Sequence, residues 1–435
     1  MGDFDKTRVK YIGDINLRRK ITFLDLFAGG GGLSEGFIRA GFKPIAHVEV
    51  DQASCYSLKT RSAYHYLNYN NKLNYYSDYL SGNITRNEYY SLIPSELIES
   101  VINLEIGEKN NPEIFNRVDR LLNGKKLDLI IGGPPCQAYS LVGRARDKNG
   151  MKGDRRNYLY EYYADFLRYY KPECFIFENV TGLLSAVDCD NIPFLEKMKI
   201  LFRKIGYITS HSVLSAKDYG IPQNRKRLFI FGSKDSGKRQ FPEPDKINLE
   251  GSAYDYFKDL PEIKAGEGTV RPTPKIKSHS RYLAETGIND TNGTITFQVA
   301  RPHNKQDLSI YRIAVQKWNE KRERLDYNDL PSHLKTHKNI NSFRDRFKVV
   351  VGDLPYSHTI VAHIAKDGHY YIHPDIEQNR SLTPREAARL QTFPDSYFFE
   401  SISENPGKTA AYKQIGNAVP VLLAQKIAEK LREVF

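Results

Sequence analysis

A single cysteine stands in the most constrained segment of this 435-residue chain. Cys136 follows two glycines and two prolines, residues 132–135, which come directly after the apolar run 127–131. Such a run predicts a parallel strand, and an open α/β sheet places ligands and reacting groups where these strands end. The thiol becomes a strong nucleophile if positive charge or a helix N-terminus lowers its pKa from about 8.5. A buried, inert thiol is the commoner alternative, so residues elsewhere must decide between the two.

Two further segments carry a carboxyl group and two arginines that suit the same site. Glu178 follows the apolar run 174–177, where partial burial raises a carboxyl pKa toward neutral and allows proton transfer. Arg225 and Arg227 share one face of an extended segment, whereas Lys226 points away. The alternatives are a helix N-terminal charge for Glu178 and a basic surface cluster for the arginines. Their combination with Cys136 favours a reaction site.

The N-terminal region predicts the first unit of a nucleoside-binding, doubly wound sheet. The expected elements are a strand over residues 21–26, a glycine loop, a helix over 33–40 and a strand over 44–50. Glu49 lies twenty residues after Gly29, the spacing expected for an acid that binds ribose hydroxyls. A nicotinamide cofactor is the weaker alternative, because Ser34 stands where the dinucleotide fingerprint has its third glycine.

Together these segments resemble the DNA cytosine-5 methyltransferase family. Residues 25–32 are similar to the family's cofactor loop, 380–391 to its penultimate motif and 414–420 to its last. Six motifs in the family's order are far more specific than any one alone. The resemblance implies an α/β fold, with a doubly wound, Rossmann-like S-adenosylmethionine-dependent methyltransferase domain and a second, smaller mixed target-recognition domain.

The resemblance also implies roles for the reacting residues. Cys136 would add to carbon 6 of a cytosine, which activates carbon 5 for methyl transfer. Glu178 would bind the N3 edge of the base, Arg227 would donate to its exocyclic oxygen, and Arg225 would orient Glu178 or the thiolate. S-adenosyl-L-methionine is the implied donor and S-adenosyl-L-homocysteine the product. The expected cofactor contacts are Phe27, Gly29, Gly31, Gly32, Glu49, Val50, Glu105, Pro134, Leu159 and Asn417, with Glu105 standing where the family has Asp.

Double-stranded DNA is the expected partner, and the target base must be flipped out of the helix to be reached. A net charge of +12 and a pI near 9.2 agree with a polyanionic partner. Residues 301–350 hold twelve Lys and Arg against six Asp and Glu, although a solvated helix surface is the alternative there. The glycine- and arginine-rich segment 141–156 could close over the flipped base. The expected DNA contacts are Gln137, Ser140, Arg144, Arg146, Arg155, Arg301, Arg344 and Arg346.

Changes in composition divide the chain. We expect a catalytic domain over residues 1–232, with a Tyr- and Asn-rich insertion of polar helices at about 65–125. Proline and glycine rise after residue 233, and a target-recognition domain is expected over 233–400, braced by a helix over 382–391. Residues 401–435 should return to the catalytic domain, with residues 411–435 forming a strand and a helix.

Composition excludes several classes of protein. The four cysteines form neither a disulfide framework nor zinc-type pairs, so we expect no metal site. No apolar run reaches eighteen residues and the first twenty residues lack a signal core, which predicts a cytoplasmic protein without a membrane partner. A monomer is expected, because an asymmetric two-domain clamp needs no second subunit.

Three other functions share part of this pattern, and one feature of the sequence argues against each. A branch of the same family methylates cytosine in tRNA, but its Cys-Phe-Thr signature is absent here. A catalytically dead DNA-binding protein would have lost Cys136, Glu178 or Arg227. A zinc nucleobase deaminase needs a second cysteine three residues after the first, which Pro135-Cys136 lacks. The sequence therefore predicts a DNA (cytosine-5-)-methyltransferase. The modification half of a restriction–modification pair, whose endonuclease acts separately, is the expected setting, and a solitary regulatory or phase-variable methyltransferase is the alternative.

Overall fold

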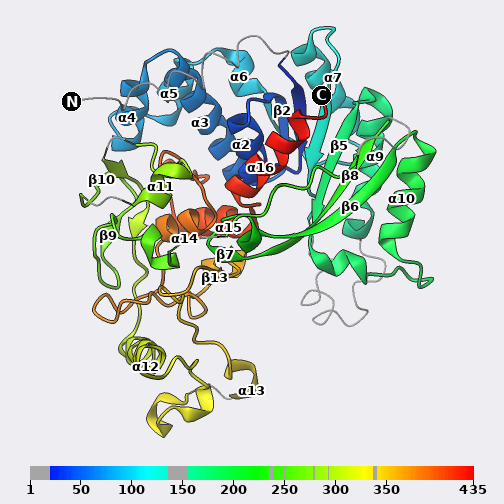
Figure 1. The fold of residues 1–435 in the computed structure, drawn as a ribbon. Helices are drawn as coiled ribbons and strands as arrows, with labels where there is room; N and C mark the ends of the chain where they lie inside the picture. The colour runs from blue at the N-terminus through cyan, green and yellow to red at the C-terminus, as the bar shows by residue number, and fades with distance from the viewer. Residues whose placement is uncertain are drawn as a thin grey trace.

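The computed structural model describes residues 20–135, 155–234, 240–248, 251–277, 280–291, 293–336 and 340–435. Within them a seven-stranded sheet organises the larger body of the molecule (Figure 1). The strand order is β3-β2-β1-β4-β5-β8-β6. The bounds are β1 Thr22–Leu26, β2 Lys43–Glu49, β3 Val101–Asn103, β4 Leu129–Gly132, β5 Cys174–Asn179, β6 Ile208–Ser215 and β8 Lys226–Ser233. The strands expected over 21–26 and 44–50 are therefore confirmed to within one residue at each end.

The sheet is mostly parallel, and its connectivity marks where a ligand should bind. β1 pairs in parallel with β2 and β4, β2 with β3, and β4 with β5, whereas β8 runs antiparallel between β5 and β6. The chain order reverses between β1 and β4. Ligands of open α/β sheets bind at such a switch point, beyond the carboxyl ends of the strands. The doubly wound fold class expected from the sequence is confirmed.

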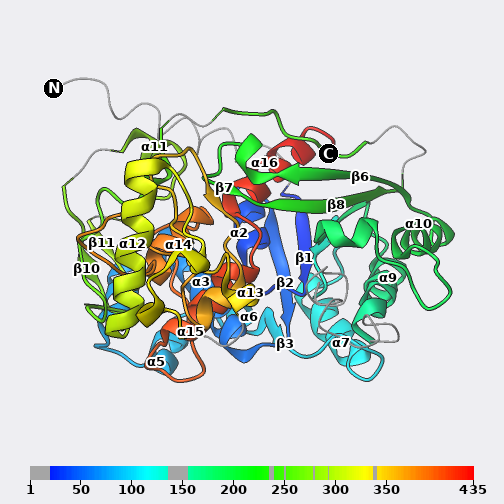
Figure 2. The same cartoon turned by 90° about the horizontal axis from the view of Figure 1, so that it is seen from below.

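Helices cover both faces of the sheet, as near-continuous apolar strands require. Side chains such as Leu24 and Ile130 pack against α7, α9 and α10, and Phe23 and Ile131 pack on the opposite face against α2 and α16. Figure 2 shows α7, α9 and α10 gathered beyond one side of the sheet. The bounds are α2 Gly32–Arg39, α7 Asn111–Leu122, α9 Leu159–Tyr170, α10 Phe194–Lys204 and α16 Val421–Arg432.

The Tyr- and Asn-rich insertion is shorter than the sequence suggested. Its predicted range of about 65–125 includes β3 and α7, but β3 pairs with β2 and α7 packs on the sheet. The helices added beside the sheet are α4 Leu73–Ser81, α5 Arg86–Ser91 and α6 Ser95–Glu99, which follow the long α3, Gln52–Tyr69. Their tyrosines pack inward: Tyr76, Tyr79 and Tyr89 are buried, and the last two stack with ring centroids 4.6 Å apart.

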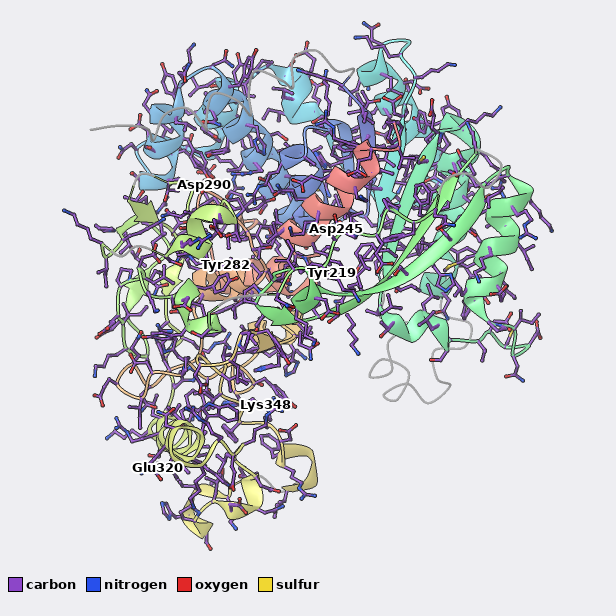
Figure 3. The ribbon with its side chains drawn as sticks, viewed as in Figure 1. Tyr219, Asp245, Tyr282, Asp290, Glu320 and Lys348 are labelled. Atoms are coloured by element: carbon purple, nitrogen blue, oxygen red, sulfur yellow. The ribbon has the colours of Figure 1, made fainter. Side chains whose placement is uncertain are left out.

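Residues beyond β8 form a second, mixed region with very little sheet. Its elements are β9 Gly268–Thr269, β10 Thr273–Pro274, α11 Arg281–Glu285, β11 Thr294–Ile295, β12 Gln298–Val299, α12 Lys305–Lys321, α13 Ile340–Phe343, β13 Ser357–His358 and α14 Pro384–Leu390. β13 pairs in parallel with β7, Gln223–Asn224, which lies just before β8. A lobe with its own apolar core, including Tyr311 and Phe347, carries α12 and α13. This lobe projects from the body in Figure 1, and Figure 3 labels Glu320 and Lys348 on it.

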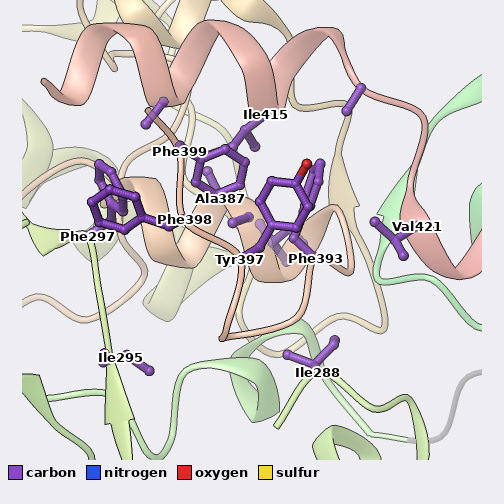
Figure 4. Close-up of a cluster of buried hydrophobic side chains, with 14 of the residues drawn as sticks. Ile288, Ile295, Phe297, Ala387, Phe393, Tyr397, Phe398, Phe399, Ile415 and Val421 are labelled. Carbon is purple, nitrogen blue, oxygen red and sulfur yellow. The ribbon is translucent and has the colours of Figure 1, made fainter. Parts of the chain in front are cut away.

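Contacts across the boundary tie the second region to the first. The Tyr282 hydroxyl of α11 donates to the carbonyl of Gly220, and Figure 3 labels Tyr282 and Tyr219 close to this boundary. A shared apolar cluster, including Phe297, Phe393 and Phe399, packs residues of both regions together (Figure 4). The two regions therefore share this cluster, while the lobe of α12 and α13 keeps its own.

The helix expected over 382–391 is α14, and it is buried on every side. Thr383 and Glu386 form a capping box at its start. Arg385 donates to the carbonyl of Thr296 at 2.9 Å, and Arg389 pairs with Asp395 at 2.7 Å. Burying guanidinium groups without such partners would be costly. Arg385 and Arg389 therefore bind other parts of the second region to α14.

The C-terminal return differs from the prediction. Residues 411–435 were expected to form a strand and a helix, but they belong to two helices, α15 Lys408–Asn417 and α16. A glycine inside a helix usually weakens it. Here a Cβ atom on Gly416 would lie 2.3 Å from the backbone of Val361 and Ala362. The glycine is needed for close packing of the helix on that turn rather than as a break between elements.

Three histidines of the second region, of which His373 is buried and His303 and His358 are half-buried, make stability depend on pH. Burial lowers the pKa of His303, His358 and His373 from 6.5 to about 4. The unfolded chain therefore takes up protons between pH 6.5 and 4 that the folded chain refuses, so stability falls as the pH is lowered through that window. For the fully buried His373 the loss is of the order of 3 kcal/mol.

We expect this loss to appear as a falling midpoint of urea unfolding between pH 6.5 and 4. His373→Gln should reduce the slope in that window, whereas the exposed His333→Gln should leave it unchanged. An unchanged slope in the His373 variant would contradict the assignment.

No helix among the described residues is long and apolar enough to cross a membrane.

Candidate active site

A cavity of about 880 Å³ opens at the carboxyl ends of β1, β2, β4 and β5. It lies where the switch point of the sheet predicts a ligand site. Nine of the ten residues expected to contact a cofactor line it: Phe27, Gly29, Gly32, Glu49, Val50, Glu105, Pro134, Leu159 and Asn417. Gly31 is the exception. It caps α2 with a φ of 76°, and a Cβ atom there would lie 2.6 Å from the Tyr397 hydroxyl oxygen.

Glu49 holds the glycine loop against the end of β2. The amide of Gly29 donates to one carboxylate oxygen at 2.7 Å, and the amides of Val50 and Asp51 donate to the other at 2.9 and 2.8 Å. Burial nevertheless raises the pKa of this carboxyl group. Phe27 and Gly29 both take left-handed backbone conformations, with φ of 56° and 54°. The loop therefore turns sharply and is tied at its base to the acid predicted to bind a ribose.

Asp25 is a cavity residue that the sequence prediction did not single out. It lies at the carboxyl half of β1 and lines the cavity, but only 1% of its surface is exposed. One carboxylate oxygen lies 3.3 Å from Nδ1 of His47, and Oδ1 is buried without a partner among the described residues. Burial raises the pKa of Asp25. Its place directly before Leu26 and Phe27 in the cofactor-loop motif was the available signal.

Glu178 and Arg227 meet in the wall of the same cavity. Glu178 lies near the end of β5 and Arg227 near the start of the adjacent antiparallel β8, and Oε1 of the one is 2.9 Å from Nε of the other. Burial raises the pKa of Glu178, while the charges of Arg227 and Arg225 oppose that effect. The geometry supplies a carboxyl group that holds a proton more readily than an exposed glutamate, next to a fixed cation.

Gly133 gives Glu178 the space it occupies. A Cβ atom on Gly133 would lie 2.6 Å from Oε2 of Glu178 and 2.9 Å from its carbonyl oxygen. We expect Gly133→Ala to displace the carboxyl group and to lower kcat by about 10- to 100-fold, since a shift of about 1 Å can cost that much.

The measurement is steady-state kinetics together with a thermal melt. Gly107→Ala is the matched control, because its added Cβ meets nothing within 4 Å. Equal kcat values in the two variants would contradict a positioning role for the glycine.

Arg225 reaches a different set of partners from the one expected. The residue is 1% exposed, and its guanidinium donates to the carbonyls of Ile360 at 2.6 Å, Gly416 at 3.2 Å and Asn417 at 3.5 Å. These contacts join the second region and the end of α15 to the site. The effect of Arg225 on Glu178 is through charge, which lowers the pKa of that carboxyl group.

The cysteine loop itself lies outside the described residues. This applies to Cys136, Gln137, Ser140, Arg144 and Arg146, and to the side chain of Arg155. The described chain leads directly to it, because Pro134 and Pro135 line the cavity. Nδ2 of Asn179 donates to the Pro134 carbonyl at 3.4 Å, and Oδ1 of Asn179 accepts a hydrogen bond from the amide of Val180 at 2.8 Å. This asparagine, which the sequence prediction missed, ties the cysteine segment to the strand that carries Glu178.

The three arginines expected to contact DNA from the second region differ in availability. Arg301 donates to the carbonyls of Lys366 at 2.6 Å and Ile364 at 2.8 Å, so it holds a short turn in place. Arg346 pairs with Asp367 and its side chain is 21% exposed. Arg344 pairs with Asp326, but its side chain is 68% exposed. Of the three, Arg344 has the guanidinium that a phosphate could reach most easily.

A second wall of the cavity comes from residues 401–419. Ser401, Ile402, Ser403, Asn405 and Gln414 all line it, although none was predicted. The motif at 414–420 was the sequence signal for part of this wall. Nothing in the composition of 401–407 marked that segment, because its position depends on contacts with distant helices.

Comparison with known proteins identifies the relatives of this chain. The family model for C-5 cytosine-specific DNA methylases matches residues 21–74 and 101–433. Type II methyltransferase M.Bpa9945I of Bacillus paralicheniformis is 39% identical over 452 residues, which cover 94% of this chain and 98% of that protein. Type II methyltransferase M1.HphI of Haemophilus parahaemolyticus is 29% identical, covering 94% and 86%.

One solved structure shows the same fold at low identity. It is that of an E. coli prophage-encoded protein assigned as a DNA modification methyltransferase, which aligns with a TM-score of 0.60 and 22% identity. The alignment covers 95% of this chain and 99% of that one. The stretch 75–100, which the family model leaves unmatched, contains most of α4 and all of α5 and α6.

Proposed function

Because this chain belongs to the C-5 cytosine-specific DNA methylase family, we propose that it transfers a methyl group from S-adenosyl-L-methionine to carbon 5 of a cytosine in a short, specific double-stranded DNA sequence. The observation that carries the proposal is one cavity. It combines a glycine loop and Glu49 with the Glu178–Arg227 pair, at the end of the strand that leads to Cys136.

The cavity residues fit the proposed cofactor. Its walls offer apolar contact from Phe27 and Leu159 and a carboxylate at Glu49 placed for ribose hydroxyls. Oδ1 of Asp25, which is buried and has no hydrogen-bond partner among the described residues, is an acceptor for a cationic group such as the amino group of the methionine end. When bound, S-adenosyl-L-methionine supplies an electrophilic methyl group, and S-adenosyl-L-homocysteine is the product.

Cys136 is the proposed nucleophile. Carbon 5 of cytosine is too weakly nucleophilic to attack a methyl donor directly. Addition of a thiolate to carbon 6 forms a carbon–sulfur bond and turns the ring into an enamine, whose carbon 5 then attacks. Transfer of the proton from carbon 5 to water then expels the thiolate and restores the aromatic ring. Two moderate steps replace one difficult step.

Glu178 and Arg227 assist this addition from the other edge of the base. The carboxyl group of Glu178 shares its proton with N3 as the thiolate adds, because burial raises its pKa toward working pH. Arg227 donates to the exocyclic oxygen and keeps Glu178 oriented through their 2.9 Å contact. The resulting ring stays neutral instead of carrying the full negative charge of the addition.

The base must leave the helix to reach this pocket, at a cost of a few kcal/mol. Gln137, Ser140, Arg144, Arg146 and Arg155 are proposed to contact the DNA around the flipped nucleotide. Residues 233–400 are proposed to recognise the target sequence, with Arg344 as their most accessible phosphate contact. We propose a monomer that works in the cytoplasm.

The relatives named type II methyltransferases support a place in restriction–modification. In that setting methylation protects host DNA from a separate endonuclease that recognises the same sequence.

Bisulfite sequencing of a random DNA library tests the function. The library is incubated with the purified protein and S-adenosyl-L-methionine. One short motif methylated at a single cytosine position is the expected result. Absence of 5-methylcytosine, from a preparation that is folded and binds the cofactor, would overturn the DNA proposal and direct the test to tRNA.

A further inference from the structure

We propose that Arg86, in the insertion α4–α6, is a positioning residue that holds residues 400–403 as the outer wall of the cofactor cavity and so sets cofactor affinity. The inference rests on the proposed function, since it takes the cavity to bind S-adenosyl-L-methionine. Arg86 is the first residue of α5 and falls within the stretch 75–100 that the family model leaves unmatched.

The guanidinium of Arg86 gathers three consecutive carbonyls of the chain. Nη2 donates to Ser401 at 2.9 Å and to Ser403 at 3.0 Å, and Nη1 donates to Ile402 at 3.3 Å. The residue is only 4% exposed, and its guanidinium carbon lies 4.1 Å from the centre of the Tyr56 ring. A planar fork with several fixed donors can hold such a turn, whereas a point charge cannot.

The same guanidinium is anchored by a buried carboxylate. Nη2 of Arg86 lies 3.1 Å from Oε2 of Glu400, which has no exposed surface. The hydroxyls of Thr60 and Tyr79 donate to the other oxygen, each at 2.6 Å. Gln414, itself a cavity residue, donates to the Glu400 carbonyl at 2.9 Å. Side chains from helices α3, α4, α5 and α15 therefore meet at Glu400, the residue directly before Ser401 of the cavity wall.

The residues that Arg86 holds are those that meet the cavity. Ser401, Ile402 and Ser403 line it. Ile402 is 64% exposed, and Val50, from the end of β2, is 59% exposed and lines the same cavity. A cofactor bound between these segments would cover both apolar side chains, which favours binding in proportion to the area removed from water. Movement of residues 401–403 would lose that contact.

This arrangement gives the insertion a role that its composition did not reveal. Its tyrosines pack the helices onto the body, and its one buried arginine extends past them to the cavity wall. The insertion therefore acts on the cofactor site without contributing a side chain to the cavity.

Arg86→Lys is the variant that tests the proposal. Lysine keeps a positive charge beside Glu400, so the buried carboxylate is not left unpaired, but it cannot span the three carbonyls. We expect the Kd for S-adenosyl-L-methionine, measured by calorimetry without DNA, to rise about tenfold, which corresponds to about 1.4 kcal/mol. The kcat at saturating cofactor should stay within about twofold of wild type, because no reacting group is touched.

Hydrogen exchange in cofactor-free protein gives a second readout. The amides of residues 400–407 should exchange faster in Arg86→Lys, whereas those of the central sheet should not change. Arg271→Lys is the matched control, because Arg271 also docks on the insertion, by donating to the Leu80 carbonyl at 3.1 Å, but does not contact residues 400–403. It should leave both the Kd and the exchange of that segment unchanged.

The outcomes separate this inference from the proposed function. If Arg86→Lys binds the cofactor like wild type and its 400–407 amides exchange at the wild-type rate, the positioning role is wrong. If wild-type protein does not bind S-adenosyl-L-methionine, the proposed function fails. The comparison of hydrogen exchange still tests whether Arg86 holds residues 400–403 in place. Should Arg86→Lys fail to fold, Tyr56→Leu removes the ring under the guanidinium, together with a hydroxyl whose partner is the exposed Gln52, and a smaller change in the same direction is expected.

Discussion

Cys136→Ser is expected to lower the rate of methyl transfer by about 10⁴-fold or more, while the Kd for the cofactor stays at the wild-type value. A serine hydroxyl is far less acidic than a thiol and does not add to carbon 6 of cytosine at neutral pH. Without that addition carbon 5 is not activated, whatever the position of the donor. The measurement is transfer of labelled methyl groups to DNA, with calorimetry to follow cofactor binding.

A mechanism-based substrate makes this test specific. Fluorine at carbon 5 of the target cytosine cannot leave as the proton does, so the carbon–sulfur bond formed at carbon 6 persists after methyl transfer. Wild-type protein should form a denaturant-resistant adduct with such DNA, and Cys136→Ser should not. Cys189→Ser is the matched control, since that thiol is exposed and does not line the cavity. An adduct that maps to any residue other than Cys136 would overturn the assignment.

Glu178→Gln should lower kcat by about 10³-fold without weakening cofactor binding. Glutamine retains the size and hydrogen-bonding capacity of the side chain but has no proton to share with N3 of the base. Glu105→Gln is the matched comparison, because it removes a different carboxyl group from the same cavity. It should raise the KM for the cofactor and leave kcat close to wild type. A Glu178→Gln enzyme that keeps more than a third of the wild-type kcat would contradict the proposed role.

The stability of the Glu178 variant separates catalysis from folding. Because burial raises the pKa of Glu178, the folded protein binds this proton more tightly than the unfolded chain. The contribution of Glu178 to stability therefore falls as the pH rises from about 4.5 to the raised folded pKa. Glutamine does not titrate, so the variant loses this dependence of stability on pH. It also loses both the cost of burying the carboxylate and the attraction of that carboxylate to Arg227. Urea unfolding at several pH values should show little change in stability at neutral pH and a flatter dependence.

The strands and the residues that end them could be predicted because their signals are local. The apolar run before Gly132 and the run before Glu178 each predict a buried strand, and both strands are present. Since parallel strands place their carboxyl ends at one edge, the sequence also predicted that Glu49, Glu178 and the proline segment before Cys136 would meet. In the structure Glu49, Glu178 and Pro134 line the same cavity.

Other features depended on contacts between residues far apart in the chain. The expected strand after residue 411 is part of helix α15, which packs closely on residues 361 and 362 at Gly416. Arg225 was expected to orient Glu178 or the thiolate, and the sequence did not predict that it also donates to the carbonyls of residues 360 and 416, more than a hundred positions away. Alternation along a strand predicts the face of a side chain, but not which backbone another segment will bring to it.

The sequence by itself determined the first strand–loop–helix–strand unit, the strands before Gly133 and Glu178, the family motifs and the residue types at the reacting edge, because each follows from periodicity, turn chemistry or a short contiguous pattern. Only the tertiary structure decided that residues 401–403 close the cofactor cavity and that an arginine of the insertion holds them there. Three carbonyls, a buried Glu400 and an arginine more than three hundred positions earlier become a unit only when folding brings them within hydrogen-bonding distance.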